Sequence, residues 1–229
     1  MPSAEELTTD KTFLFLSILG VIPAHILTFG IVWLVVTEGR RYPFWKTVGF
    51  EWPPSWKPWK GIAFSVLLAV VLLGIGALVT NLYGGSKTQL DLLIESSYQA
   101  RLATAFLAVA TAPLIEELIY RGVLYPALER TIGMGFAIAV VSLMFAGVHV
   151  LQYSNNLAVI AVITLLSISL TMVRAFTGKL LPCFVIHLVF NGLQSAFLLL
   201  EPLFDKTDKT TPTTAPALNL IVQALHYLN

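Results

Sequence analysis

The feature that most constrains the fold is a series of long apolar segments. A helix needs about 20 apolar residues to span the hydrocarbon core of a bilayer. We therefore predict an all-α fold, a polytopic transmembrane helical bundle of about six to eight helices, formed by residues 1–229 as one membrane-embedded domain. The segment 217–228 is short for a span and is predicted to lie at the interface or to form a partial span. The six predicted spans are 12–37, 61–83, about 100–130, 134–152, 157–175 and 182–200.

Composition agrees with this class and excludes others. Hydrophobic residues make up 56% of the chain and charged residues only 12%, whereas soluble domains average about 25% charged. The formal net charge of +1 gives no basis for binding nucleic acid. Cys183 is the single cysteine, so an internal disulfide is excluded.

Charges in the loops predict the orientation. Cytoplasmic loops carry an excess of lysine and arginine. The tryptophan-rich loop 38–60 and the turns near Arg130 and Arg174 are basic, whereas the opposite side is mainly acidic. The sequence therefore predicts an integral multi-pass protein with its N-terminus outside and the tryptophan-rich loop in the cytoplasm.

Ionisable side chains lie inside the predicted spans, where each costs roughly 2.5–3.5 kcal/mol on insertion scales. Glu117 and Arg121 are four residues apart, so they share a helix face and are predicted to form a supporting ion pair. Glu116 lies about 100° further round the helix and is left without a cation, although Tyr120 can donate a hydrogen bond to it.

Later spans add Phe145 with His149, and His187 with Asn191, each pair four residues apart. Counting residues from the turn near 132–133 places Glu116 and His149 both ~25 Å from it. The same count places His187 and Asn191 at a shallower depth, unless the turn at 177–181 dips into the membrane or the helices tilt.

These motifs carry a family resemblance. E-E-x-x-x-R at 116–121, F-x-x-x-H at 145–149 and H-x-x-x-N at 187–191 occur in order on successive hydrophobic segments. This region, about 100–195, resembles the catalytic-motif core of the CPBP family of CAAX proteases and bacteriocin-processing enzymes, also called Abi. The family's best-known branch is the type II CAAX prenyl endopeptidases. The size of the chain and the style of its motifs favour a prokaryotic plasma membrane.

The resemblance implies an intramembrane glutamic endopeptidase. In that family the position of Glu116 is the catalytic glutamate, and that of His149 is its partner in activating water. His187 and Asn191 match the oxyanion pair, while Glu117 and Arg121 match supporting positions. Tyr120 and Phe145 are also predicted to be supporting residues. The expected substrate is a membrane-associated or lipid-modified peptide or protein, with the lipid bilayer as surroundings.

The chemistry also follows from the residues. Peptide hydrolysis needs a base for water, and a positioned carboxylate contributes about 10²–10⁴-fold. An oxyanion needs donors, which an imidazole and an amide can supply.

Two other chemistries use some of the same residues. Glu116, His149 and His187 make a His₂Glu set of the kind that binds zinc. The sequence lacks H-E-x-x-H and the resemblance implies a metal-free mechanism, so no metal and no cofactor is predicted. Cys183 lies four residues before His187, which suggests a thiol–imidazole dyad that we consider the weaker interpretation.

Two non-proteolytic functions also fit this class of protein. A membrane immunity or regulatory scaffold protein of the same family would keep the motifs without catalysis. A transporter would use the buried acid as a proton relay, although we find no internal repeat of the kind many transporters contain. Pro23 and His25 in the first span, and His226 in the tail, are interpreted as kink and interface residues.

Overall fold

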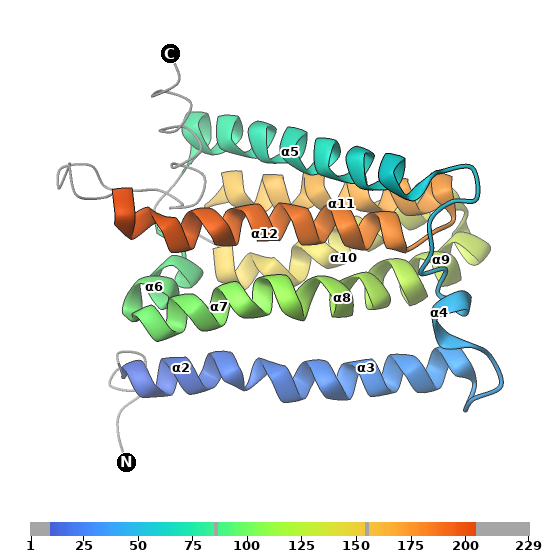
Figure 1. Cartoon of the computed structure of the whole chain (residues 1–229), viewed down its shortest axis with the longest axis horizontal. Coiled ribbons are helices and arrows are strands. Elements are labelled where there is room, and N and C mark those ends of the chain that lie inside the picture. Colours follow the sequence, from blue (N-terminus) through green and yellow to red (C-terminus); the bar gives the residue numbers. More distant parts are fainter. Residues whose placement is uncertain (1–9, 85–86, 154–155, 205–229) are drawn as a thin grey trace.

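The computed structural model describes residues 10–84, 87–153 and 156–204, and the elements in these ranges are all helical. The predicted interfacial segment 217–228 and His226 lie outside the described residues. Figure 1 shows the helices running side by side along the long axis of the molecule. The elements are α2 (Lys11–Leu19), α3 (Val21–Thr37), α4 (Phe44–Thr47), α5 (Pro58–Tyr83), α6 (Gln89–Ser96), α7 (Tyr98–Ala110), α8 (Ala112–Glu117), η1 (Leu118–Leu124), α9 (Tyr125–Ile132), α10 (Met134–Tyr153), α11 (Leu157–Thr177) and α12 (Leu181–Phe204).

The predicted polytopic helical bundle is confirmed. Within the described ranges, five helical segments are long and apolar enough to cross a bilayer. The sixth predicted span, 134–152, forms α10, whose apolar part Met134–Val150 is shorter than the other five. The five are Thr12–Thr37, Pro58–Tyr83, Tyr98–Ile132, Leu157–Thr177 and Leu181–Leu200.

The long segment Tyr98–Ile132 is interrupted where the sequence weakens a regular α-helix. Pro113 has no backbone N–H, and the helix breaks just before it at Thr111, which separates α7 from α8. From Leu118 to Leu124 the chain forms a π-helix, whose hydrogen bonds run to the fifth residue instead of the fourth. Pro126 does not end the segment, because it lies in the first turn of α9, where a missing N–H is tolerated.

The core of the bundle lies between α5, α11 and α12. Leu170, Cys183 and Ile186 are fully buried there. In Figure 1, α2 and α3 run along one edge of the molecule and α5 along the other. Only 11% of the most apolar stretch of Thr12–Thr37 is buried, so the first span presents most of its surface outward, as a lipid-facing helix would.

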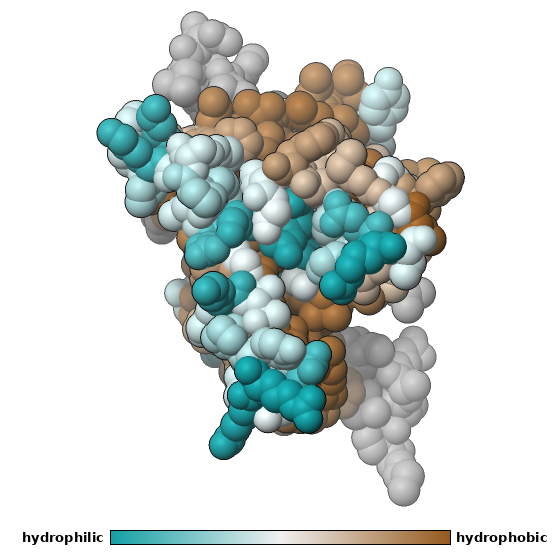
Figure 2. Space-filling model, turned by 90° about the vertical axis from the view of Figure 1, so that its right-hand side faces the viewer, coloured by the Kyte–Doolittle hydropathy of each residue, from teal (hydrophilic) through white to brown (hydrophobic). Residues whose placement is uncertain are grey.

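The end of the bundle that carries α4 and α9 is sealed by packing between turns. The Leu180 N–H donates to the Gly49 carbonyl at 2.8 Å, and Leu180 and Val48 are both fully buried. Gly49 has φ +73°, and a Cβ there would lie 3.0 Å from a guanidinium nitrogen of Arg174, so glycine is required. Figure 2 views this end, where hydrophilic side chains gather between hydrophobic flanks. We call it the basic end, after Arg40, Arg41, Lys46, Lys57, Lys60, Arg130, Arg174 and Lys179.

Candidate active site

All four predicted catalytic side chains line one cavity of about 520 Å³. Glu116 comes from α8, His149 from α10, and His187 and Asn191 from α12. Phe145 lines the same cavity. Residues separated by up to 75 positions in the sequence are therefore brought around a single space.

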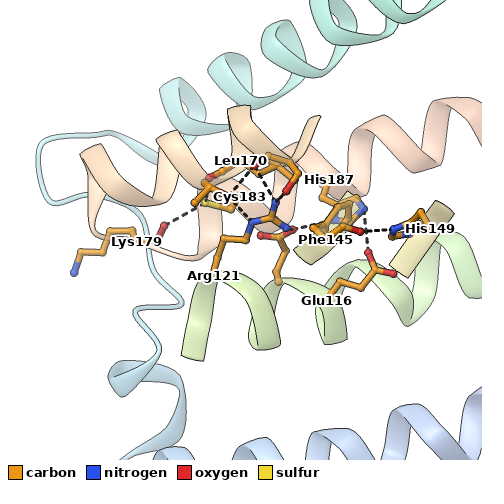
Figure 3. A network of polar contacts seen from close by, with 11 residues as sticks. Glu116, Arg121, Phe145, His149, Leu170, Lys179, Cys183 and His187 are labelled. Atoms are coloured by element: carbon orange, nitrogen blue, oxygen red, sulfur yellow. Dashed lines mark hydrogen bonds and ion pairs between the residues drawn. The ribbon is translucent and has the colours of Figure 1, made fainter. Parts of the chain in front are cut away.

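Glu116 is positioned by the break in the long segment. It lies in the short helix α8, directly after the interruption at Thr111. Its side chain is 23% exposed, and its Oε2 lies 3.7 Å from Nε2 of His187. In Figure 3 the Glu116 carboxylate points toward His187. Because it lines the cavity and remains partly accessible, this carboxylate can meet a water molecule or a substrate.

Glu117 and Arg121 form the predicted ion pair, with 2.9 Å between Glu117 Oε1 and Arg121 Nη1 and with both side chains fully buried. Arg121 also donates from Nη2 to the Ser167 carbonyl at 3.0 Å and to Ser167 Oγ at 2.7 Å. Its Nε donates to Thr171 Oγ1 at 3.2 Å. The guanidinium lies 4.7 Å from the centre of the Phe145 ring, within cation–π range. Arg121 therefore ties η1 to α11 and α10.

The same carboxylate also orients His187. Nδ1 of His187 lies 2.9 Å from Glu117 Oε1. A carboxylate paired with arginine only accepts hydrogen bonds, so Nδ1 carries the proton and donates. Nε2 is thereby directed to Glu116 and into the cavity, which gives Glu117 a positioning role that the i, i+4 spacing alone did not reveal.

His187 reaches the level of Glu116, although counting along an untilted helix placed it shallower. The two side chains meet because α8 and α12 pack against each other around the cavity. Leu180, directly before α12, is fully buried against the loop that contains Gly49, whereas Gly178 in the same turn is exposed.

His149 is held by its own helix. Its Nδ1 lies 2.8 Å from the Phe145 carbonyl oxygen, four residues earlier. A carbonyl oxygen only accepts, so Nδ1 must carry a proton, and in the neutral ring Nε2 is left as a proton acceptor. No direct hydrogen bond joins His149 to Glu116 among the described residues, and both line the cavity. A space between two such groups suits a bridging water.

Asn191 binds at the helix break. Its Nδ2 donates to the Ala108 carbonyl at 2.9 Å, just before the interruption at Thr111. An amide nitrogen has two hydrogens, so one remains for another acceptor. The interruption at Thr111 therefore positions both Glu116 and Ala108, the partner of Asn191.

His25 is a cavity residue that sequence reasoning assigned to a kink or interface. The structure places it in the cavity lining, with Nδ1 2.9 Å from Thr111 Oγ1. The first span is divided at Gly20, three residues before Pro23, because α2 ends at Leu19 and α3 begins at Val21. Two features of the sequence could have indicated this contact: a histidine in an apolar span and a threonine two residues before Pro113.

The predicted hydrogen bond from Tyr120 to Glu116 is wrong. The two residues make no such bond, and the Tyr120 ring packs edge-on against Phe145 with centroids 5.1 Å apart. The reason is the π-helix that begins at Leu118, because its wider turn changes which side chains align.

The geometry does not form the thiol–imidazole dyad. Cys183 is fully buried, and its Sγ donates to the Leu170 carbonyl at 3.3 Å, while Nδ1 of His187 is paired with Glu117. Figure 3 shows Cys183 on the far side of Arg121 from Glu116. For zinc, no group of three or more His, Cys, Asp or Glu side chains in residues 10–84, 87–153 and 156–204 is arranged to hold a metal ion.

Comparison with known proteins identifies the motif-bearing region. Residues 98–193 match the family described as "Type II CAAX prenyl endopeptidase Rce1-like". Residues 98–193 are therefore similar to that family, and the match covers less than half of the chain. The matched range contains every residue of the predicted site, so the resemblance drawn from the three motifs is confirmed for this region.

The chain is also similar to a curated protein. The chain is 25% identical over 153 residues to "Membrane-embedded CAAX protease MroQ" of Staphylococcus aureus (strain USA300). The alignment covers 63% of this chain and 59% of the relative, so it leaves a large part of the relative unmatched. No solved structure matches the chain.

Proposed function

We propose that the protein is an intramembrane, metal-independent glutamic endopeptidase that hydrolyses peptide bonds of membrane-associated or lipid-modified peptides or proteins. The observation that carries this proposal is the convergence of Glu116, His149, His187 and Asn191 on one cavity. The family match supports a CAAX protease-like membrane protein. The roles given to individual residues rest on the resemblance of the three motifs and on the geometry of the cavity.

In the proposed reaction, Glu116 is the general base. A water molecule between Glu116 and Nε2 of His149 gives a proton to the Glu116 carboxylate as its oxygen attacks the peptide carbonyl carbon. His149 holds the water through its free ring nitrogen, since Nδ1 is occupied by the Phe145 carbonyl. A carboxylate in this role contributes about 10²–10⁴-fold to the rate.

Attack produces a tetrahedral intermediate with a negatively charged oxygen. Asn191 donates its remaining N–H to that oxygen, and His187 donates from Nε2 in its doubly protonated state. Loss of one such donor costs about 10²–10³-fold in turnover. When the intermediate collapses, the C–N bond breaks, Glu116 returns the proton to the leaving amine, and a carboxylic acid remains on the other product.

The surrounding residues supply what the reaction needs besides acid and base. Phe145 and Leu166 are among the apolar residues that line the cavity, while Gln152 and Gln194 are among its polar lining residues. Apolar walls favour a substrate that arrives from the bilayer, and polar groups allow water to accompany it. This combination suits a membrane-associated peptide better than a freely soluble one.

The test uses the purified full-length protein and its Glu116→Gln variant, each incubated with a panel of membrane-associated peptides. We expect cleavage by the parent and none by the variant. Cleavage by both would remove Glu116 as the base. Absence of cleavage by the parent, with its biological effect retained in the variant, would favour the regulatory scaffold instead.

A second arm addresses the metal. The parent is assayed after treatment with a strong chelator, and activity is expected to persist. Loss of activity that added zinc restores would overturn the metal-independent part of the proposal. Because both arms use the same panel of peptides, the conclusion about Glu116 and the conclusion about the metal can be separated.

A further inference from the structure

The cavity occupies only one end of the bundle. From α11 it takes side chains between Val159 and Leu166, in the first half of that helix, and from α10 it takes those from Phe145 to Tyr153, in the second half. The first span contributes only residues between Ser17 and His25. Short helix α6 and the residues just before it also line the cavity. All these segments lie away from the basic end, as Figure 1 shows for α6 and α9.

The route from Glu116 to the basic end is filled. Immediately beyond Glu116 come the buried ion pair of Glu117 and Arg121 and the fully buried Leu118. Further along, Val48 and Leu180 are fully buried where the turns pack together. The cavity therefore extends from Glu116 toward α6, whereas packed side chains block the way from Glu116 toward α9.

The two ends differ in charge in the way that orients membrane proteins. Eight lysine and arginine residues lie at the basic end, against three acids, Glu38, Glu51 and Glu129. The opposite end, over residues 10–201, has three basic residues, Lys11, Lys87 and Arg101, against four acids, Asp10, Asp91, Glu95 and Glu201. The excess of basic residues places the basic end in the cytoplasm by the positive-inside rule.

We infer that the cavity receives its substrate from the non-cytoplasmic face of the membrane. The inference that the cavity takes a substrate rests on the proposed function. The side of the membrane rests on the filled basic end and on the charge difference between the two ends. The substrate class is then a peptide segment that lies at or in the outer leaflet, such as the outward-facing part of a membrane protein or a peptide that has already been translocated. A cytoplasmic peptide would have to cross the bilayer before it could reach Glu116.

Labelling of one introduced cysteine tests the side without requiring catalysis. Cys183 is fully buried, so the parent chain provides the background. Ser17 lines the cavity and is exposed, and Ser55 is exposed in the loop at the basic end. The Ser17→Cys and Ser55→Cys variants are thus a matched pair, with Gln152→Cys as a second cavity position should Ser17→Cys fail to fold.

A membrane-impermeant maleimide is applied to sealed right-side-out and inverted vesicles that contain each variant. We expect the cavity variants to be labelled in right-side-out vesicles and Ser55→Cys only in inverted ones. Labelling of the cavity variants only in inverted vesicles, or from neither side, would overturn the inference.

A cleavage assay with the parent separates the inference from the proposed function. A membrane-impermeant peptide that detergent-solubilised protein cleaves is added outside each type of vesicle, and cleavage is expected with right-side-out vesicles. Cleavage with inverted vesicles alone overturns the side but preserves the peptidase. If the solubilised protein cleaves no peptide, the proposed function fails, and the labelling result still decides which face the cavity opens on.

Discussion

The two halves of the bundle use polar side chains in opposite ways. Directly beyond Glu116 toward the basic end, Arg121 is buried and bonded to fixed partners, namely Glu117, Ser167 and Thr171. In the cavity half, His149 and Asn191 each donate one hydrogen bond to a backbone carbonyl. This leaves Nε2 of His149 and the second amide hydrogen of Asn191 available for a ligand. The comparison teaches that this protein separates groups that hold the helices together from groups that are available for chemistry.

The largest effect on activity is expected at a cavity position. His149→Ala should lower kcat about 10²–10⁴-fold, the usual contribution of a group that assists proton transfer. The thermal midpoint should change little, because the lost hydrogen bond is to a carbonyl within the same helix. Turnover and unfolding are measured on the same preparation. A variant that unfolds early yet keeps full turnover when folded would place His149 among the structural groups.

The largest effect on stability is expected in the packed half. Arg121→Ala leaves the Glu117 carboxylate buried without its cation, and breaking a buried pair in this way costs about 3–5 kcal/mol. Denaturation in detergent micelles measures the loss, with the exposed position Arg130→Ala as the control that should retain stability. Unchanged stability together with complete loss of turnover would show that the supporting assignment of this pair is wrong.

A smaller effect is expected at the contact between the first span and the helix break. His25→Leu removes the hydrogen bond to Thr111, worth about 0.5–1.5 kcal/mol for a typical pair. His25→Asn should restore much of the loss, because its amide nitrogen can donate from a position similar to Nδ1. We expect kcat to fall with His25→Leu and to recover with His25→Asn. Equal loss in both variants would contradict a hydrogen-bonding role for this residue.

The smallest effect is expected at an exposed pair on the basic end. The Lys179 ammonium hydrogen-bonds Glu51 and lowers the pKa of its carboxyl below the usual value. A lowered folded-state pKa means that the contribution is present above the unfolded pKa and is lost as pH falls through the folded one. Glu51→Gln should leave the thermal midpoint nearly unchanged at neutral pH and flatten its decline in acid. A large drop at neutral pH would mean that exposed and buried pairs do not differ as proposed.

Much of this arrangement could be predicted from the sequence. Apolar runs of sufficient length predicted the spans, and spacing within one helix predicted the pairing of Glu117 with Arg121. Three motifs in order predicted which residues share the cavity. These features depend on local periodicity, which the sequence displays directly.

Other features depend on contacts between distant segments and could not be predicted in this way. The bond from His187 to Glu117 joins two helices at residues 70 positions apart in the sequence. The π-helix at Leu118–Leu124 changed the neighbours of Tyr120. Spacing rules for a regular α-helix do not contain either effect.

The neighbouring acids Glu116 and Glu117 provide the most direct test of the account. Each is replaced by glutamine, and kcat/KM and the free energy of unfolding are measured for both variants and the parent. We predict that Glu116→Gln loses cleavage while its free energy of unfolding is retained. Glu117→Gln should lower the free energy of unfolding, because it leaves Arg121 buried without a counter-charge. Full cleavage by a folded Glu116→Gln protein, or a loss of stability at 116 that exceeds the loss at 117, would contradict the division of roles on which the proposed function depends.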